Sequence, residues 1–287
     1  MDRTANGLLN GFIGVVIFSG SLPATRVAVA DFDPVFLTVA RAAIAGLLGL
    51  ALLLALREKR PARADLLPLA VVALCVVVGF PLLTALALKH VTSAHSIVFI
   101  GLLPLATAIF GVLRGGERPQ PSFWFFAILG SLFVVGFPWT QGLSASPIGH
   151  LLMFAPVIVC GLGYAEGARL SRHLGGWQVI SWALVLSLPI MAGLSLATLP
   201  GSLAQAGGPA WLGLAYVSLF SMLIGFVFWY RGLAQGGIAA VGQLQLLQPF
   251  FGLALAGLLL GETVGWQMIA TSAAVVLCVA GARRYAR

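Results

Sequence analysis

Charged residues are scarce in this sequence. Of its 287 residues, 16 are Lys or Arg and 8 are Asp or Glu, whereas 60% are hydrophobic and the mean hydropathy is +1.04. About a quarter of the residues in an average soluble domain are charged, because a water-exposed surface requires them. The low charge content therefore excludes a soluble globular protein and predicts a surface that mostly contacts lipid.

Acidic side chains are the rarest charged group, and none lies near the middle of a predicted membrane span. Glu166 is the deepest, close to a predicted span end, with Arg169 nearby. A proton-driven exporter of cationic drugs needs a carboxylate buried in the membrane. The lack of one favours downhill or weakly coupled transport of a neutral or zwitterionic solute. The eight acidic residues are Asp2, Asp31, Asp33, Glu58, Asp65, Glu117, Glu166 and Glu262.

Potential metal ligands and nucleophiles are also few. The three cysteines, Cys75, Cys160 and Cys278, lie in apolar runs without CxxC or Cys/His spacing. The histidines other than His95 are dispersed over different loops and span ends, with no carboxylate at ligand spacing, so we expect no metal, no cofactor and no enzymatic activity. They are His90, His150 and His173.

The net charge of +8 does not indicate a nucleic-acid partner, because the basic residues occur singly or in short clusters between apolar runs. We expect a lipid bilayer and a small-molecule substrate as the partners.

Ten apolar runs have about the 20 residues that a helix needs to cross roughly 30 Å of hydrocarbon. The connections between them are short, which predicts a single membrane domain. The predicted spans are 7–30, 34–56, 66–88, 92–113, 122–139, 147–170, 177–199, 209–230, 239–260 and 264–282.

The distribution of basic residues predicts the orientation of the chain. Thirteen of the 16 Lys and Arg residues fall on one side if the N-terminus is cytoplasmic, and only Arg26 and Lys89 fall on the other. Basic loops stay in the cytoplasm. We therefore expect a multi-pass protein of the cell inner (plasma) membrane with both termini cytoplasmic. Six tryptophans near span ends predict an aromatic belt; they are Trp124, Trp139, Trp177, Trp211, Trp229 and Trp266.

An internal repeat appears when the chain is shifted by 145 residues without a gap. The shift aligns the fourth and fifth spans with the ninth and tenth. Five spans per half is an odd number, so the second half is expected to be inverted, as in secondary transporters. The predicted halves are 1–140 and 146–287. The matching pairs are Leu88 and Leu233, Ala94 and Ala239, Pro104 and Pro249, Gly116 and Gly261, Glu117 and Glu262, and Gly136 and Gly281.

The ten-span layout, together with the repeated Pro104-to-Glu117 and Pro249-to-Glu262 signature, resembles the EamA-type branch of the drug/metabolite transporter superfamily. The resemblance covers essentially the whole chain. It implies a basket-like fold with a central cavity between the halves, and export of amino acids or other metabolites. The size and the histidine in the fourth span are similar to the aromatic amino acid exporters of this family. The signature implies no binding residues.

Polar residues inside the spans are the substrate-binding candidates, because lipid exposure of such groups is costly. Arg41, in the second span, either binds a substrate carboxylate, snorkels outward, bonds to a helix-end carbonyl or pairs with Asp31 or Asp33. His95 and Phe99 are expected on one helical face with Leu102, where the imidazole either lines a cavity or bonds to a backbone carbonyl.

The other candidates form short stripes on their predicted helices. Each stripe either lines a cavity or serves helix packing, since small and amide side chains commonly join membrane helices. Pro104 and Pro249 are candidate kinks or hinges, because proline frees a backbone carbonyl. The stripe residues are Asn10, Phe80 with Thr84, Tyr164, Ser218 with Ser221, and Gln245 with Gln248.

The sequence therefore predicts a transporter that exports small neutral or zwitterionic metabolites, in the first place aromatic or other neutral amino acids, by alternating access. The alternatives are export of another metabolite or drug class, or a passive pore. Gly7 and Gly11 have GxxxG spacing, which we interpret as packing within the bundle. We expect the monomer to be functional.

Overall fold

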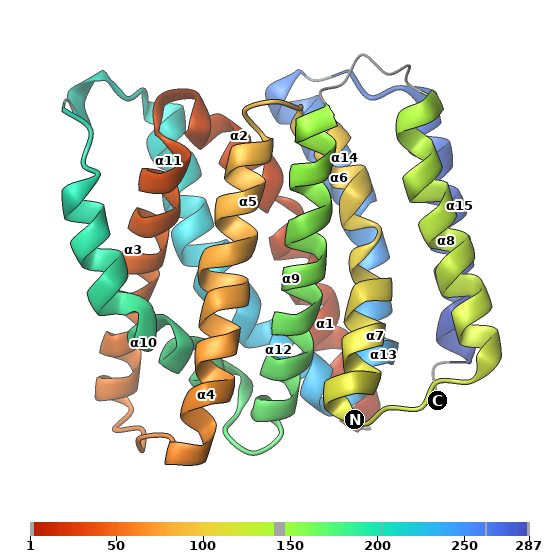
Figure 1. Ribbon diagram of the computed structural model, residues 1–287, viewed down its shortest axis with the longest axis horizontal. Coiled ribbons are helices and arrows are strands. Elements are labelled where there is room, and N and C mark those ends of the chain that lie inside the picture. The colour runs from red at the N-terminus through yellow and green to blue at the C-terminus, as the bar shows by residue number, and fades with distance from the viewer. Residues whose placement is uncertain (1–2, 141–146, 202, 262, 286–287) are drawn as a thin grey trace.

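The computed structural model of the protein describes residues 3–140, 147–201, 203–261 and 263–285, and every regular element within these ranges is helical (Figure 1). The predicted all-α class is confirmed. Six described helices are long and apolar enough to cross a membrane: Thr4–Asp31, Pro34–Ala55, Arg63–Ala87, Gly176–Ala197, Gly208–Gly236 and Ile238–Leu260. Three shorter apolar helices are Leu103–Gly115, Pro121–Phe133 and Trp266–Ala282.

Successive helices run up and down the bundle, and the two chain ends lie on the same side (Figure 1). The elements of the first part of the chain are α1 (Arg3–Ser19), α2 (Ser21–Asp31), α3 (Pro34–Ala55), α4 (Arg63–Val72), the π-helix η1 (Ala73–Gly79), α5 (Phe80–Ala87), α6 (Ser93–Ile100), α7 (Leu103–Gly115) and α8 (Pro121–Thr140).

The second part of the chain has a similar succession of helices, although its first helix, α9, is unbroken. Its elements are α9 (Pro147–Ser171), α10 (Gly176–Ala197), the short 3₁₀-helix η2 (Leu203–Gln205), α11 (Gly208–Tyr216), the π-helix η3 (Val217–Ile224), α12 (Gly225–Gly236), α13 (Ile238–Gly242), the 3₁₀-helix η4 (Gln243–Leu247), α14 (Gln248–Leu260) and α15 (Trp266–Arg284).

Two of the helical interruptions precede the prolines of the sequence repeat. Pro104 is the second residue of α7, and Pro249 is the second residue of α14. Neither proline can donate a hydrogen bond to the carbonyl four residues earlier. The α-helix consequently stops at Ile100 before Pro104 and takes a 3₁₀ form before Pro249. A hinge role for these prolines stays a prediction.

Three further interruptions were not foreseen from the sequence. The first predicted span breaks at Gly20, between α1 and α2, and the third and eighth spans contain η1 and η3. A π-helix bonds residue i to residue i+5, so it is wider than an α-helix and often occurs at functional sites. The two π-helices occupy corresponding places in the two parts of the chain.

The repeated glycines have the same local role. Gly116 (φ 71°) ends α7, and Gly261 (φ 62°) ends α14. Both adopt the left-handed conformation that favours glycine at a helix C-terminus. The residue after Gly116 is Glu117, whose carboxylate caps the N-terminus of α13. Its repeat partner, Glu262, lies outside the described residues.

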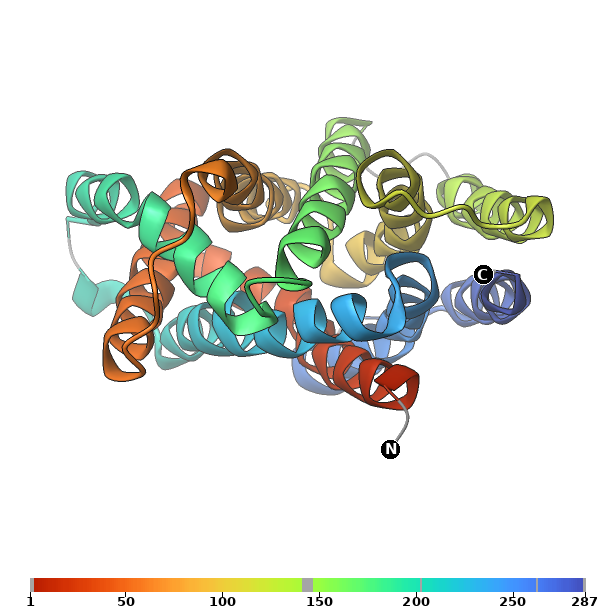
Figure 2. The same ribbon diagram turned by 90° about the horizontal axis from the view of Figure 1, so that it is seen from below.

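Close backbone contacts hold the two parts together. A Cβ atom on Gly7 of α1 would lie 2.6 Å from the Gly236 backbone nitrogen, and one on Gly232 of α12 would lie 2.6 Å from that of Gly11. The GxxxG spacing thus serves packing within the chain. Helices α8 and α15 pack on each other at one end of the molecule (Figure 2).

The predicted aromatic belt needs one correction. Trp229 is fully buried in the core instead of lying at an interface. Its ring contacts Tyr164 and Phe18, with ring centroids 5.4 and 6.2 Å away. The position of a tryptophan near a span end in the sequence does not determine which side of the helix it faces, and here the indole packs against other aromatic rings in the core.

Candidate functional site

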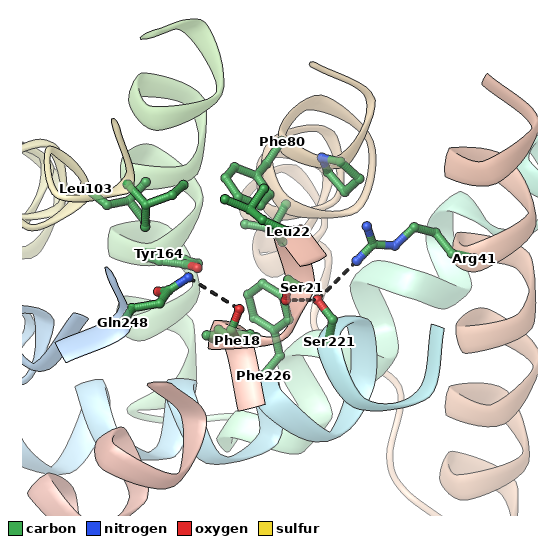
Figure 3. Close-up of a pocket in the computed structure, with 13 residues that line it drawn as sticks. Phe18, Ser21, Leu22, Arg41, Phe80, Leu103, Tyr164, Ser221, Phe226 and Gln248 are labelled. Atoms are coloured by element: carbon green, nitrogen blue, oxygen red, sulfur yellow. Dashed lines mark hydrogen bonds between the residues drawn. The ribbon is translucent and has the colours of Figure 1, made fainter. Parts of the chain in front are cut away.

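A small cavity lies in the centre of the bundle, where the interrupted helices from both parts of the chain meet (Figure 3). Its polar lining residues are Ser21, Arg41, Tyr164, Ser221 and Gln248. Its aromatic and aliphatic walls include Phe18, Leu22, Phe80, Leu103 and Phe226. Val76 of η1, Pro81 of α5 and Ile100, the last residue of α6, complete the lining.

Arg41 supplies the only charge among the described lining residues. Its side chain extends from α3 to the cavity, and its Nη2 atom donates a hydrogen bond to Ser221 Oγ at 3.2 Å (Figure 3). Ser221 Oγ also lies 2.7 Å from Ser21 Oγ. Arg41 is 4% exposed, and its Nε atom has no hydrogen-bond partner among the described residues.

Gln248 lies on the other side of the same view (Figure 3). Its Nε2 atom donates to the Phe18 carbonyl oxygen at 3.4 Å, beside the Gly20 break. Its Oε1 atom is buried and has no partner within the described part of the chain. Gln248 therefore retains an acceptor for a ligand donor or a water molecule.

Aromatic rings surround the polar groups. The Phe18 and Phe226 ring centroids are 5.0 Å apart in an edge-to-face arrangement, and the Phe18 and Tyr164 rings are stacked at 6.4 Å. Such rings form a rigid apolar wall with low conformational freedom. The cavity can accommodate an apolar group next to a charged one.

The cavity volume is about 20 Å³, which is room for about one water molecule. This volume is too small for an organic solute. Binding of a metabolite requires the surrounding helices to move apart.

Five sequence candidates meet in this cavity: Arg41, Phe80, Tyr164, Ser221 and Gln248. They come from α3, α5, α9, η3 and α14. The suggestion that Arg41 pairs with Asp31 or Asp33 is wrong. Asp31 Oδ2 accepts from the Gly207 backbone nitrogen at 2.8 Å. Asp33 caps α3, because its Oδ1 accepts from the Val35 backbone nitrogen at 2.8 Å.

Three candidates are bonded outside the cavity. Asn10 Nδ2 donates to Gln235 Oε1 at 3.2 Å and so joins α1 to α12. Thr84 Oγ1 donates to the Phe80 carbonyl at 2.8 Å, and Ser218 Oγ donates to the carbonyl four residues earlier at 2.6 Å. In these places hydroxyl and amide groups satisfy backbone or neighbouring-helix partners.

The fourth-span candidates require a further correction. The expected helical face through Leu102 does not exist, because α6 ends at Ile100 and Leu102 lies in the break. Phe99 is buried against Phe154, with ring centroids 5.2 Å apart, and does not line the cavity. The His95 side chain lies outside the described residues.

Gln245 lies in η4 and does not line the cavity. It is fully buried, and neither of its amide atoms has a hydrogen-bond partner of ordinary geometry among the described residues. Tyr164 is one of its electrostatic neighbours.

Sequence reasoning missed the apolar lining residues beside the helix breaks. Phe18 and Leu22 flank Gly20, and Phe226 follows η3. Ser21, which also lines the cavity, was recognisable from the sequence as a polar residue on the same predicted helical face as Asn10 and Gly14.

A charged network lies away from the cavity, at the C-terminal end of α9. The fully buried Glu166 accepts from Arg169 Nη2 at 2.6 Å and from Arg114 Nε of α7 at 2.9 Å. Arg172 lies 3.7 Å from Glu117, which bonds to the backbone of α13. These contacts tie three segments together at one end of the bundle.

Comparison with known proteins assigns the chain to a family. The pattern of the EamA-like transporter family matches residues 5–137 and again residues 147–283. The chain belongs to the EamA-like transporter family. The resemblance to the EamA-type branch is therefore confirmed, whereas the similarity to aromatic amino acid exporters stays a prediction. This EamA-like protein is a multi-pass membrane transporter.

Its relatives carry transporter names without a stated substrate. The uncharacterized transporter YdeK of Bacillus subtilis (strain 168) is 70% identical over 287 residues, which is 100% of both chains. The uncharacterized transporter YyaM of the same organism is 25% identical over 67% of this chain and 65% of its own length. An uncharacterized transporter of Archaeoglobus fulgidus is 22% identical over 83% of each chain.

A solved crystal structure of another protein has the same fold as this EamA-like transporter. The TM-score is 0.75, and the match covers 98% of this chain and 99% of the other at 20% sequence identity. This likeness supports the helical architecture alone.

Proposed function

We propose that this transporter exports small neutral or zwitterionic metabolites, in the first place amino acids, by alternating access. Its ten apolar helical segments would cross the cell inner (plasma) membrane as two inverted halves, 1–140 and 146–287, with both termini in the cytoplasm. A single chain would suffice, because the cavity is built from one copy.

Several independent features support the inverted topology. The family pattern matches the chain twice, and the glycine C-caps and π-helices occupy corresponding places in both matches. The chain ends lie on the same side of the bundle (Figure 1), in agreement with the concentration of basic residues on one predicted side. Inverted repeats with interrupted helices at the centre are typical of secondary transporters.

The central cavity is the observation that carries the proposal. It combines a guanidinium, two serine hydroxyls, a phenol and an amide with aromatic rings, and both parts of the chain contribute to it. None of the described lining residues is acidic. A solute with a polar end and an apolar body matches this lining, as a neutral amino acid does.

The cavity size supports alternating access over a passive pore. A pore requires a continuous polar path through the protein, whereas this cavity has room for about one water molecule. Rocking of the two halves would widen it towards one side at a time. The helix breaks adjoining the cavity are suitable points for that motion.

Efflux from proteoliposomes tests the proposal. We expect saturable efflux of labelled neutral amino acids through the wild-type protein. Ser221→Phe, which overfills the cavity, should abolish this efflux, whereas Leu258→Trp, at a position 83% exposed on the outer surface, should retain it. Absence of saturable efflux for every amino acid would refute the substrate assignment, and single-channel currents would favour a pore.

A further inference from the structure

Arg41 is a buried cation without an acidic partner. It is 4% exposed, and its one hydrogen bond to a described residue goes to the neutral Ser221 hydroxyl. All six described acidic residues are bonded elsewhere in the protein: Asp31 to Gly207, Asp33 to Val35, Glu58 to Gln178, Asp65 to His173, Glu117 to Ile238, and Glu166 to Arg114. The positive charge at the cavity therefore has no counter-ion from these residues.

A charge in this environment is costly for the fold. A central arginine in a membrane helix costs about 2.5–3.5 kcal/mol on insertion scales. A buried charge is normally paired or fully hydrogen-bonded. Arg41 is neither, because its Nε atom has no partner among the described residues. An anionic acceptor in the cavity would supply the partner that the described residues do not.

The neighbouring hydroxyls add a second donor for such an acceptor. Ser221 Oγ accepts the Arg41 hydrogen bond and shares one hydrogen with Ser21 Oγ, at 2.7 Å. Each hydroxyl carries one hydrogen, and only one of the two can lie between the oxygens. The second hydroxyl hydrogen, on whichever serine, is therefore free to point at a ligand.

We propose that Arg41, assisted by the Ser21–Ser221 hydroxyl pair, binds the carboxylate of the transported solute, and that this carboxylate is the group the transporter requires. The proposal rests on the transport function proposed above and defines its substrate class by the carboxylate instead of by the net charge of the solute. Guanidinium is well suited to a carboxylate, because its planar N–H groups form charge-assisted hydrogen bonds with both oxygens.

The other lining residues do not distinguish an ammonium group from a hydroxyl group. Its described lining contains no carboxylate to pair with an ammonium group. The unpartnered Gln248 Oε1 can accept a hydrogen bond from an amine or from a hydroxyl equally well. Solutes with a hydroxyl in place of the ammonium group should bind as amino acids do, so the substrate class extends to 2-hydroxy acids.

The position of the Arg41–Ser221 hydrogen bond also links substrate binding to the motion of the two halves. Arg41 lies on α3 in the first matched segment, and Ser221 lies in η3 in the second. Any rocking of one half against the other changes this contact. A carboxylate between the two groups would hold them together in the loaded state.

Competition against a labelled amino acid tests whether the transporter requires a carboxylate on its substrate. The experiment uses the wild-type protein, which avoids any folding defect. Two series are used: phenylalanine, phenyllactate and phenylalaninamide, and alanine, lactate and alaninamide. We expect the acids and hydroxy acids to inhibit efflux of the labelled amino acid, and the amides to fail at tenfold higher concentration. Inhibition by an amide as strong as by its acid would overturn the proposal while the transport function stands. No efflux in either series would refute the function itself.

Substitutions then test the named residues. Removing a hydrogen bond to a charged group should weaken apparent affinity about 10- to 100-fold, so we expect that loss for Arg41→Gln and a smaller loss for Ser221→Ala. Arg231→Gln, at an exposed position outside the cavity, is the matched control. Wild-type apparent affinity in folded Arg41→Gln protein would overturn the assignment to Arg41.

Discussion

The Glu117 cap offers a prediction that can be worked out from the structure. Glu117 Oε1 accepts from the Ile238 backbone nitrogen at 2.7 Å, and Oε2 accepts from that of Ala239 at 2.8 Å. Both donors belong to buried residues at the start of α13. Glu117→Ala leaves both N–H groups without their acceptor, and each buried orphan costs about 1–3 kcal/mol.

The two orphans together cost about 2–6 kcal/mol, which corresponds to about a 30- to 20,000-fold increase in local opening, since about 1.4 kcal/mol is a factor of ten. Amide hydrogen exchange followed by mass spectrometry measures this directly in a peptide that covers residues 236–242. We expect exchange to accelerate by at least tenfold in Glu117→Ala. Glu117→Gln should have a smaller effect, because its amide keeps one carbonyl oxygen as an acceptor.

Arg118→Ala, which removes an exposed charge next to Glu117, is the control and should exchange as the wild type does. Exchange in Glu117→Ala within threefold of the wild type would refute the reasoning. It would mean that these two hydrogen bonds do not hold the start of α13.

Two other predictions concern stability. Glu166→Gln removes the charged acceptor for Arg169 and Arg114, at 2.6 and 2.9 Å, and should destabilise the protein by about 1–3 kcal/mol in detergent unfolding; an unchanged unfolding midpoint would contradict the role of this network. Gly232→Leu should force α1 and α12 apart and cost about 3 kcal/mol or more, because its Cβ would lie 2.6 Å from a backbone nitrogen. Gly193→Leu, where no atom lies within 4 Å, should have little effect, and equal melting of the two variants would count against the packing account.

Hydropathy predicted the apolar helical segments but not their interruptions, because lipid imposes a length and an apolar composition on each segment. The second predicted span, 34–56, compares with an observed helix of Pro34–Ala55. The start of that helix follows from local chemistry, since Asp33 caps it and Pro34 occupies its first turn. These features depend on neighbours in the sequence and can be recognised without the fold.

The site was harder to predict because it depends on contacts between distant residues. Ser21 and Ser221 are 200 residues apart, yet their hydroxyl oxygens lie within 2.7 Å. Asp31 and Asp33 were reasonable partners for Arg41 by sequence distance, but local caps and loop bonds take up both carboxylates. The positions of the π-helices, which place Val76 and Ser221 at the cavity, have no sequence signal that we recognise.

Thiol accessibility at the cavity tests the central claim most directly, namely that one site opens alternately to the two sides. The three native cysteines are buried and can be replaced by alanine, after which Ser221→Cys places a single thiol in the cavity. A membrane-impermeant thiol reagent should modify this cysteine from either side of proteoliposomes, and a saturating carboxylate substrate should slow the modification. A thiol that reacts from one side only, or at a rate unaffected by substrate, would contradict alternating access through this cavity.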